Sequence, residues 1–200
     1  MPKFHFNPLT HTYTVDGIKR LSVTQCLPYN YRGDNVAAMA KGSYVHEMCR
    51  LHLLDDLNEG TLDPALVPYL DALKLFLYES KGMGLQGVID IKSGATHPCV
   101  ELQIAAYIEL VNNGYPRRFD ETLNTHSVLL EEPFYHETYQ YCGTPDIVIQ
   151  NGSKVTQGHA LYLRDNGTYK LETIPNVRRN FEIFLQFLNT ERWKREKGLT

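Results

Sequence analysis

The sequence predicts an α/β fold, with a central mixed β-sheet flanked by helices and an N-terminal β-hairpin. Apolar residues recur with the helical period of 3.6 in residues 63–80 and lie on one side of residues 176–196. Short β-rich runs bounded by turn residues lie between the helical segments. A chain of 200 residues that is 42% hydrophobic and 22% charged can bury a sizeable core. We therefore expect residues 1–200 to form a single domain.

The N-terminal part combines β-rich residues with a long helical segment. Residues 11–24 form a predicted hairpin, because Asp16-Gly17 is a strong turn signal between two β-rich runs. Residues 34–56 are predicted to be helical, with Asp34 as the N-terminal cap. Gly42 interrupts this segment, so either one helix continues through it or two helices meet there.

The later elements alternate between helices and strands. In the helix over 63–80, Asp63 is the expected N-cap and Pro64 takes the first helical position. A helix over 98–112 ends at Asn112-Asn113-Gly114. The other predicted elements are strands over 87–92, 126–136, 141–150, 158–164 and 168–174, a loop over 115–125 and a helix over 176–196.

Composition excludes several classes of protein. The net charge of −3 argues against a strongly basic nucleic-acid binder, although a local basic groove is compatible with it. No apolar run has the length of a membrane span, and the N-terminus lacks the apolar core of a signal peptide. We therefore expect a cytoplasmic protein without a membrane partner. The cysteines are widely spaced and form no C-x-x-C pair, which predicts reduced, buried thiols and no iron–sulfur cluster; they are Cys26, Cys49, Cys99 and Cys142.

The most informative segment is Gly87-Val88-Ile89-Asp90-Ile91-Lys92-Ser93-Gly94. Side chains two apart on a strand point to the same face, so Asp90 and Lys92 should project together from an apolar strand. Both groups are costly to bury, and the pair is either an internal salt bridge or part of a site. A carboxylate that holds a divalent cation beside an ammonium group is what phosphodiester hydrolysis requires.

A second acid begins another apolar β-run, in Tyr141-Cys142-Gly143-Thr144-Pro145-Asp146-Ile147-Val148-Ile149. Pro145 cannot donate to a sheet, so Asp146 is expected at a sheet edge or strand start. It is either a turn residue or a partner of Asp90 in holding one metal ion, with the carbonyl of Ile91 as a further oxygen ligand. Such oxygen ligands suit Mg²⁺ or, alternatively, Mn²⁺. Glu131 is either an additional ligand or an exposed charge at a strand edge.

Two helical segments supply further polar side chains. His46 lies in the predicted helix 34–56 and is either a packed or surface residue or a ligand of the metal site, ranked above its neighbour Glu47. Gln103 and Tyr107 are four residues apart and share a helix face. They are either a solvent-facing amide with a core phenol, or a pair that holds a DNA phosphate or the lysine.

These segments together resemble the PD-(D/E)XK nuclease superfamily, most closely its RecB-like and phage-exonuclease branch. The matching pieces are Gly42 to His46, Gly143 to Asp146, Asp90 with Lys92, and Gln103 with Tyr107. The resemblance implies a restriction-endonuclease-like fold in which Asp90 and Asp146 are catalytic metal ligands, Lys92 is catalytic, His46 belongs to the metal site, and Gln103 and Tyr107 are supporting residues.

The order of the motifs departs from that family. In the family, the Gly-x-x-Asp strand precedes the Asp-x-Lys strand and a short hairpin joins them. Here Asp90 precedes Asp146 by more than fifty residues, so that hairpin cannot exist. Either the domain is internally permuted and builds the same site on altered connections, or one motif matches by chance.

The expected function is metal-dependent hydrolysis of DNA phosphodiester bonds. The resemblance implies an exonuclease of recombination or repair, working with a single-strand annealing protein or a helicase and able to form homo-oligomers. If the protein is phage-encoded, its location is the host cytoplasm. Two alternatives belong to other classes: a catalytically inactive PD-(D/E)XK-like module that binds DNA or protein, and a structural α/β protein whose acids form ordinary salt bridges.

Overall fold

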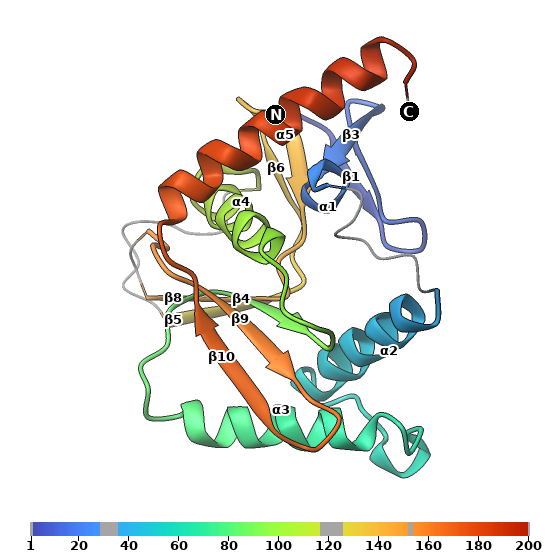
Figure 1. Ribbon diagram of the computed structural model, residues 1–200, viewed down its shortest axis with the longest axis vertical. Helices are drawn as coiled ribbons and strands as arrows, with labels where there is room; N and C mark the ends of the chain where they lie inside the picture. Colours follow the sequence, from blue (N-terminus) through green and yellow to red (C-terminus); the bar gives the residue numbers. More distant parts are fainter. Residues whose placement is uncertain (1, 29–35, 117–125, 152–153, 200) are drawn as a thin grey trace.

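The computed structural model describes residues 2–28, 36–116, 126–151 and 154–199, and has a mixed α/β architecture (Figure 1). Its helices are α1 (Val23–Cys26), α2 (Val36–Leu53), the 3₁₀ helix η2 (Glu59–Thr61), α3 (Val67–Ser80), α4 (Cys99–Asn113) and α5 (Val177–Glu196). Its strands are β1 (Phe4–Asn7), β2 (Thr12–Val15), β3 (Ile18–Ser22), β4 (Gly87–Lys92), β5 (His126–Leu130), β6 (Phe134–His136), β7 (Tyr141–Gly143), β8 (Ile147–Asn151), β9 (Gly158–Leu163) and β10 (Tyr169–Thr173).

The described strands form two mixed sheets, whereas the sequence predicted one central sheet. The first has the order β1-β2-β3-β7-β6, and β3 and β7 are parallel in it. In this sheet β2 and β3 pair antiparallel across Asp16 and Gly17, which both have positive φ. The second has the order β10-β9-β4-β8-β5, and β4 and β9 are its parallel pair.

The prediction of a single sheet was wrong because two predicted strands each divide between the sheets. Strand 126–136 becomes β5 and β6, and strand 141–150 becomes β7 and β8. Pro133 and Pro145 lie in the two interruptions, where a missing N–H breaks a hydrogen-bonded ladder. Glu131 has φ +47°, which turns the chain away from β5 directly after its last residue.

The second sheet is buried on both faces. Val88 of β4 joins a core cluster with residues of α4 and α5, whereas Ile89 and Ile91 join the cluster formed with α2 and α3. Figure 1 shows α4 and α5 on one side of this sheet and α3 on the other. Burial on both faces explains why β4 is a nearly continuous apolar run, and it places Asp90 inside the protein.

The helix boundaries follow the sequence prediction closely, except that α2 ends at Leu53 rather than residue 56 and α3 begins later than residue 63. The α2 helix is continuous through Gly42, and the predicted cap Asp34 lies outside the described residues. The α3 helix begins at Val67, so the prediction that Asp63 caps it and Pro64 opens it was wrong. Asp63 instead accepts a hydrogen bond from the backbone of Ala65, which closes a local turn before the helix.

Other predictions concern the loop 115–125, the cysteines and the membrane. Most of the loop lies outside the described residues. The cysteines are buried thiols, as predicted; they are Cys26, Cys49, Cys99 and Cys142. None of the helices within the described ranges has both the length and the hydrophobicity needed to cross a bilayer.

Helix α4 contacts both sheets as well as α1 and α5. It packs directly against Gly158, the first residue of β9. A Cβ atom built there would lie 2.2 Å from Cγ2 of Ile104 and 3.0 Å from Cδ1 of Ile108. The absence of a side chain at Gly158 therefore fixes how deeply α4 packs onto the sheet that carries Asp90.

Replacing Gly158 with Ala should lower the free energy of unfolding by about 1–3 kcal/mol, because the added methyl group overpacks the interface with α4. Chemical denaturation of the purified variant measures this change. Gly82→Ala is the matched control, since a Cβ there meets nothing within 4 Å, and a shift below about 0.5 kcal/mol is expected. Equal stability of the two variants would contradict the packing argument.

Candidate functional site

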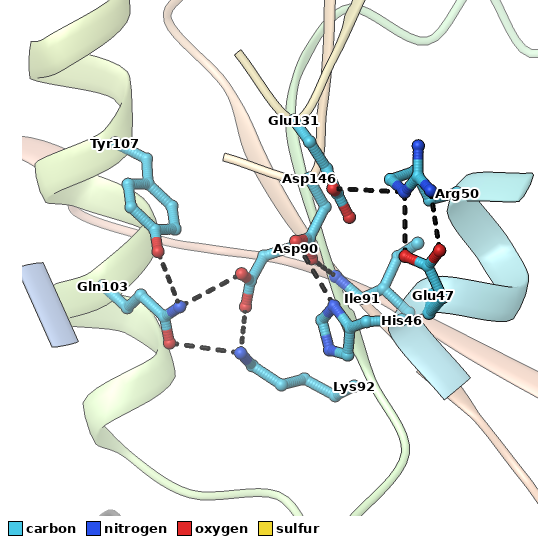
Figure 2. A network of polar contacts seen from close by, with 10 residues as sticks. All are labelled: His46, Glu47, Arg50, Asp90, Ile91, Lys92, Gln103, Tyr107, Glu131 and Asp146. Carbon is cyan, nitrogen blue, oxygen red and sulfur yellow. Dashed lines mark hydrogen bonds and ion pairs between the residues drawn. The ribbon is translucent and has the colours of Figure 1, made fainter. Parts of the chain in front are cut away.

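The candidate site is centred on two acids that lie on neighbouring strands. β4 and β8 pair antiparallel from Gly87↔Ile149 to Ile89↔Ile147. Continuing this register by one position brings Asp90 opposite Asp146. Oδ2 of Asp146 accepts a hydrogen bond of 2.6 Å from the backbone N–H of Ile91, so its carboxylate lies against the end of β4 (Figure 2). Two acids that are far apart in the sequence are therefore adjacent in the fold.

Lys92 and Asp90 project from the same face of β4, as the period of two predicted. The ammonium nitrogen of Lys92 lies 2.6 Å from Oδ2 of Asp90, which is only 1% exposed. Gln103 of α4 contacts both groups: its amide nitrogen donates to Oδ1 of Asp90 at 3.2 Å, and its carbonyl oxygen accepts from Lys92 at 3.1 Å. The same amide nitrogen donates to the hydroxyl of Tyr107 at 3.2 Å.

Gln103 and Tyr107 connect Asp90 and Lys92 to α4. Both side chains are buried, at 4% and 5% exposure, so the prediction of a solvent-facing Gln103 was wrong, whereas Tyr107 does lie in the core. Of the two partners considered from the sequence, a DNA phosphate and the lysine, the amide of Gln103 binds the lysine. The amide of Gln103 thus fixes the relative positions of Asp90 and Lys92. Its NH₂ group donates to the acid, and its carbonyl oxygen accepts from the lysine.

His46 reaches the site from α2, which passes the end of β4 (Figure 2). Its Nδ1 lies 3.4 Å from Oδ1 of Asp146, and its side chain is 31% exposed. Glu47 follows His46 but turns away and binds Arg50 with both carboxylate oxygens, at 2.6 and 2.8 Å. The structure therefore brings His46 to the acids and leaves Glu47 outside the pair, which agrees with the ranking made from the sequence.

The two acids differ in their electrostatic surroundings. Burial raises the pKa of Asp90, and the negative charge of Asp146 adds to this against the opposing effect of Lys92. Burial acts in the same direction on Asp146, but His46, Lys92 and the N–H of Ile91 together hold the pKa of Asp146 below its ordinary value. Although burial disfavours its charged form, the carboxylate of Asp146 raises the pKa of His46 above the usual value.

Two further charged residues lie near the acids: Glu131, which the sequence left as either an additional ligand or an exposed edge charge, and Arg50, which it did not indicate. Glu131 lies directly after β5, and its N–H donates to the carbonyl of Asp146 at 3.0 Å. Burial and the charge of Asp146 raise the pKa of Glu131. Nε of Arg50 lies 3.8 Å from Oε2 of Glu131. Arg50 is four residues after His46, and this helical spacing is the signal that could have identified it.

The donor atoms at this site fit a hard divalent cation. Oδ2 of the buried Asp90 lies 2.6 Å from the ammonium nitrogen of Lys92, which therefore pairs with its charge. The carboxylates of Asp90 and Asp146, with the carbonyl of Ile91, are oxygen ligands of the kind that Mg²⁺ prefers. The described residues contain no group of three or more His, Cys, Asp or Glu placed to hold a metal ion. Mg²⁺ keeps several water ligands and needs only one or two carboxylates, so two acids suffice.

Comparison of the chain with protein-family models finds no match, and comparison with curated proteins finds none either. Interpretation of the site therefore depends on the chemistry and placement of its own residues.

The network predicts a structural cost for removing Gln103. Gln103→Leu leaves the buried Asp90 and the hydroxyl of Tyr107 without their amide donor, so the free energy of unfolding should fall by about 1–3 kcal/mol. Tyr107→Phe removes one neutral acceptor and should cost about 1 kcal/mol. Denaturant unfolding of both variants measures the difference, and a Gln103→Leu protein as stable as the original would show that the network contributes nothing.

Proposed function

We propose that this protein is a metal-dependent deoxyribonuclease that hydrolyses DNA phosphodiester bonds. The observation that carries the proposal is the placement of Asp90 and Asp146 next to each other on β4 and β8, with the ammonium group of Lys92 beside Asp90. Nothing in the packing of an ordinary core requires two acids and an amine together at the end of two buried strands, since burying each of these charges is costly.

Each residue of the site would have its own role in the hydrolysis. Asp90, Asp146 and the carbonyl of Ile91 would hold Mg²⁺ or Mn²⁺, which when bound polarises the phosphate and lowers the pKa of water. In hydrolysis, the water oxygen bonds to phosphorus as the bond to the leaving sugar oxygen breaks, and that oxygen takes up a proton. Lys92 is placed to orient the attacking water and to offset the charge that develops on the phosphate oxygens. Gln103 keeps Lys92 in this position.

The strand arrangement supports a permuted PD-(D/E)XK site rather than a chance motif match. In that family, the two strands that carry the acids are joined by a short hairpin. Here β4 and β8 are antiparallel neighbours, but the chain between them passes through α4, β5, β6 and β7. Because β4 and β8 pair with each other, Asp90 and Asp146 take the relative positions that a hairpin between the two strands would give them. On this proposal, the second sheet and its flanking helices correspond to a restriction-endonuclease-like core.

The resemblance to the PD-(D/E)XK nucleases favours a narrower function within this class. The protein would be an exonuclease of DNA recombination or repair that acts in the cytoplasm, with a single-strand annealing protein or a helicase as partner. The competing proposal is an inactive module of the same fold that binds DNA or protein. The presence of both acids on neighbouring strands, with the lysine paired to Asp90, favours the enzyme.

The first test is cleavage of linear and single-stranded DNA with Mg²⁺ and with EDTA. Mg²⁺ should support cleavage and EDTA should abolish it. Lys92→Ala should lower the rate by at least about 100-fold, since it removes the charge beside the reacting phosphate. Lys74→Ala, at an exposed ion pair with Glu59 on the α3 side, is the control and should retain the original rate. No cleavage of any DNA substrate with Mg²⁺ would favour the inactive module.

The second test separates metal binding from catalysis. Asp90→Asn and Asp146→Asn each remove a charged oxygen ligand, so each should weaken Mn²⁺ binding by at least about tenfold. Electron paramagnetic resonance of free Mn²⁺ during a titration measures the affinity without any need for turnover. Asp165→Asn, in the turn between β9 and β10, is the matched control. Unchanged affinity in both site variants would remove the two acids from the metal site.

A further inference from the structure

The face of the second sheet that carries Asp90 and Lys92 continues from β4 onto β9 and β10. Lys92 pairs with Tyr162 in the register, and Asp90 pairs with Ala160. Ala160 in turn pairs with Glu172 of β10. Side chains of paired residues point to the same face of a sheet, so Tyr162 and Glu172 lie on the face that α4 and α5 cover (Figure 1). Tyr162 is one strand away from Lys92, which is about 4.8 Å between backbones.

A pocket of about 570 Å³ lies on this face. Its walls come from the start of α4, from β9 and β10, and from the residues that follow β10. They include three apolar side chains and three polar ones, which are Pro98, Val100 and Ile174, and Glu101, Tyr162 and Glu172. Apolar walls with a few polar groups are typical of pockets that enclose small organic ligands. Because Tyr162 lines it, the pocket adjoins the position of Lys92 on β4.

The hydroxyl group of Tyr162 has no hydrogen-bond partner among the residues that the structure describes. Tyr162 is only 5% exposed and lines the pocket. Burial raises the pKa of this hydroxyl, and the nearby carboxylates act in the same direction. The group is therefore protonated at neutral pH and is available to donate. Since a buried polar group without a partner costs free energy, a ligand in the pocket that accepts from Tyr162 would be stabilised.

The charges of the pocket disfavour a phosphate and favour a ligand with N–H groups. Glu101 accepts a hydrogen bond of 3.0 Å from the side chain of Asn180, and Glu172 forms an ion pair with Lys170. A carboxylate accepts several hydrogen bonds, so both acids keep acceptor capacity for a ligand. A nucleobase with an exocyclic amino group offers N–H donors at its edge, and its apolar faces suit the apolar walls.

We propose that this pocket binds the nucleobase next to the scissile phosphate and favours bases with an exocyclic amino group over thymine. The inference rests on the proposed function, to which it adds a preference among DNA substrates. Glu101 and Glu172 would accept from the amino group, as carboxylates do from N4 of cytosine. The hydroxyl of Tyr162 would donate to a ring nitrogen or carbonyl oxygen. Thymine would present a carbonyl oxygen, which the acids repel, where cytosine presents its amino group.

The experiment follows cleavage of one end-labelled, mixed-sequence DNA strand with Mg²⁺, read at each phosphodiester bond on a denaturing gel. Bonds next to cytosine should be cleaved about fivefold faster than bonds next to thymine, because one set of base-edge hydrogen bonds differs. Tyr162→Phe and Glu101→Gln should each reduce this ratio to below about twofold. Glu182→Gln, at an exposed acid of α5, is the matched control and should keep the original ratio.

The ratio is measured within one strand, so a variant that is partly unfolded loses rate at every bond without changing it. Loss of the preference in either Tyr162→Phe or Glu101→Gln supports the pocket. Equal cleavage next to cytosine and thymine in the original protein, or a preference that both variants retain, would overturn the proposal.

A binding measurement without metal separates this proposal from the proposed function. Deoxycytidine and thymidine are titrated into the protein in EDTA and followed by nuclear magnetic resonance. Deoxycytidine should bind more tightly, and Tyr162→Phe should weaken its binding. If the protein cleaves DNA without a base preference, only the pocket assignment fails. If it cleaves no DNA but binds deoxycytidine in a Tyr162-dependent way, the nuclease proposal fails and the pocket remains a nucleobase site. If neither occurs, both fail.

Discussion

The antiparallel pairing of β4 with β8 is the constraint on which the rest of the site depends. It brings Asp90 and Asp146 together inside a sheet that is covered by helices on both faces. The buried carboxylate of Asp90 and the partly buried carboxylate of Asp146 repel each other and lose hydration, which disfavours the folded state. Three of the surrounding groups offset this cost: the ammonium group of Lys92, the imidazole of His46 and the N–H of Ile91.

The site is more deeply buried on one side than on the other. On the α4 side, Gln103 and Tyr107 are buried and connect Asp90 to Lys92 through hydrogen bonds. On the α2 side, the side chains of His46 and Arg50 are about one third exposed and their contacts with the acids are longer. A ligand that approaches from solvent would therefore meet the α2 side first, while the α4 side keeps its geometry.

Local patterns predicted the parts of the fold that depend on neighbouring residues. The period of two placed Asp90 and Lys92 on one face of β4, and the i, i+4 spacing placed Gln103 and Tyr107 on one face of α4. The resemblance then selected Asp146 as the partner acid. The division of two predicted strands between sheets was missed, because an alternating pattern does not reveal which sheet a strand joins. Glu131 remained ambiguous in the sequence, since its proximity to Asp146 follows from long-range pairing with β8.

The order of the strands along the chain has a consequence for how the site is assembled during synthesis. Among the described strands, β4 pairs only with β8 and β9, and both lie more than fifty residues downstream. While the ribosome is still making the intervening segment, β4 has no neighbour in its sheet and Asp90 faces no second acid. The pair of acids therefore cannot form on a nascent chain that stops before residue 146, and any chain truncated there carries Asp90 and Lys92 without the second acid.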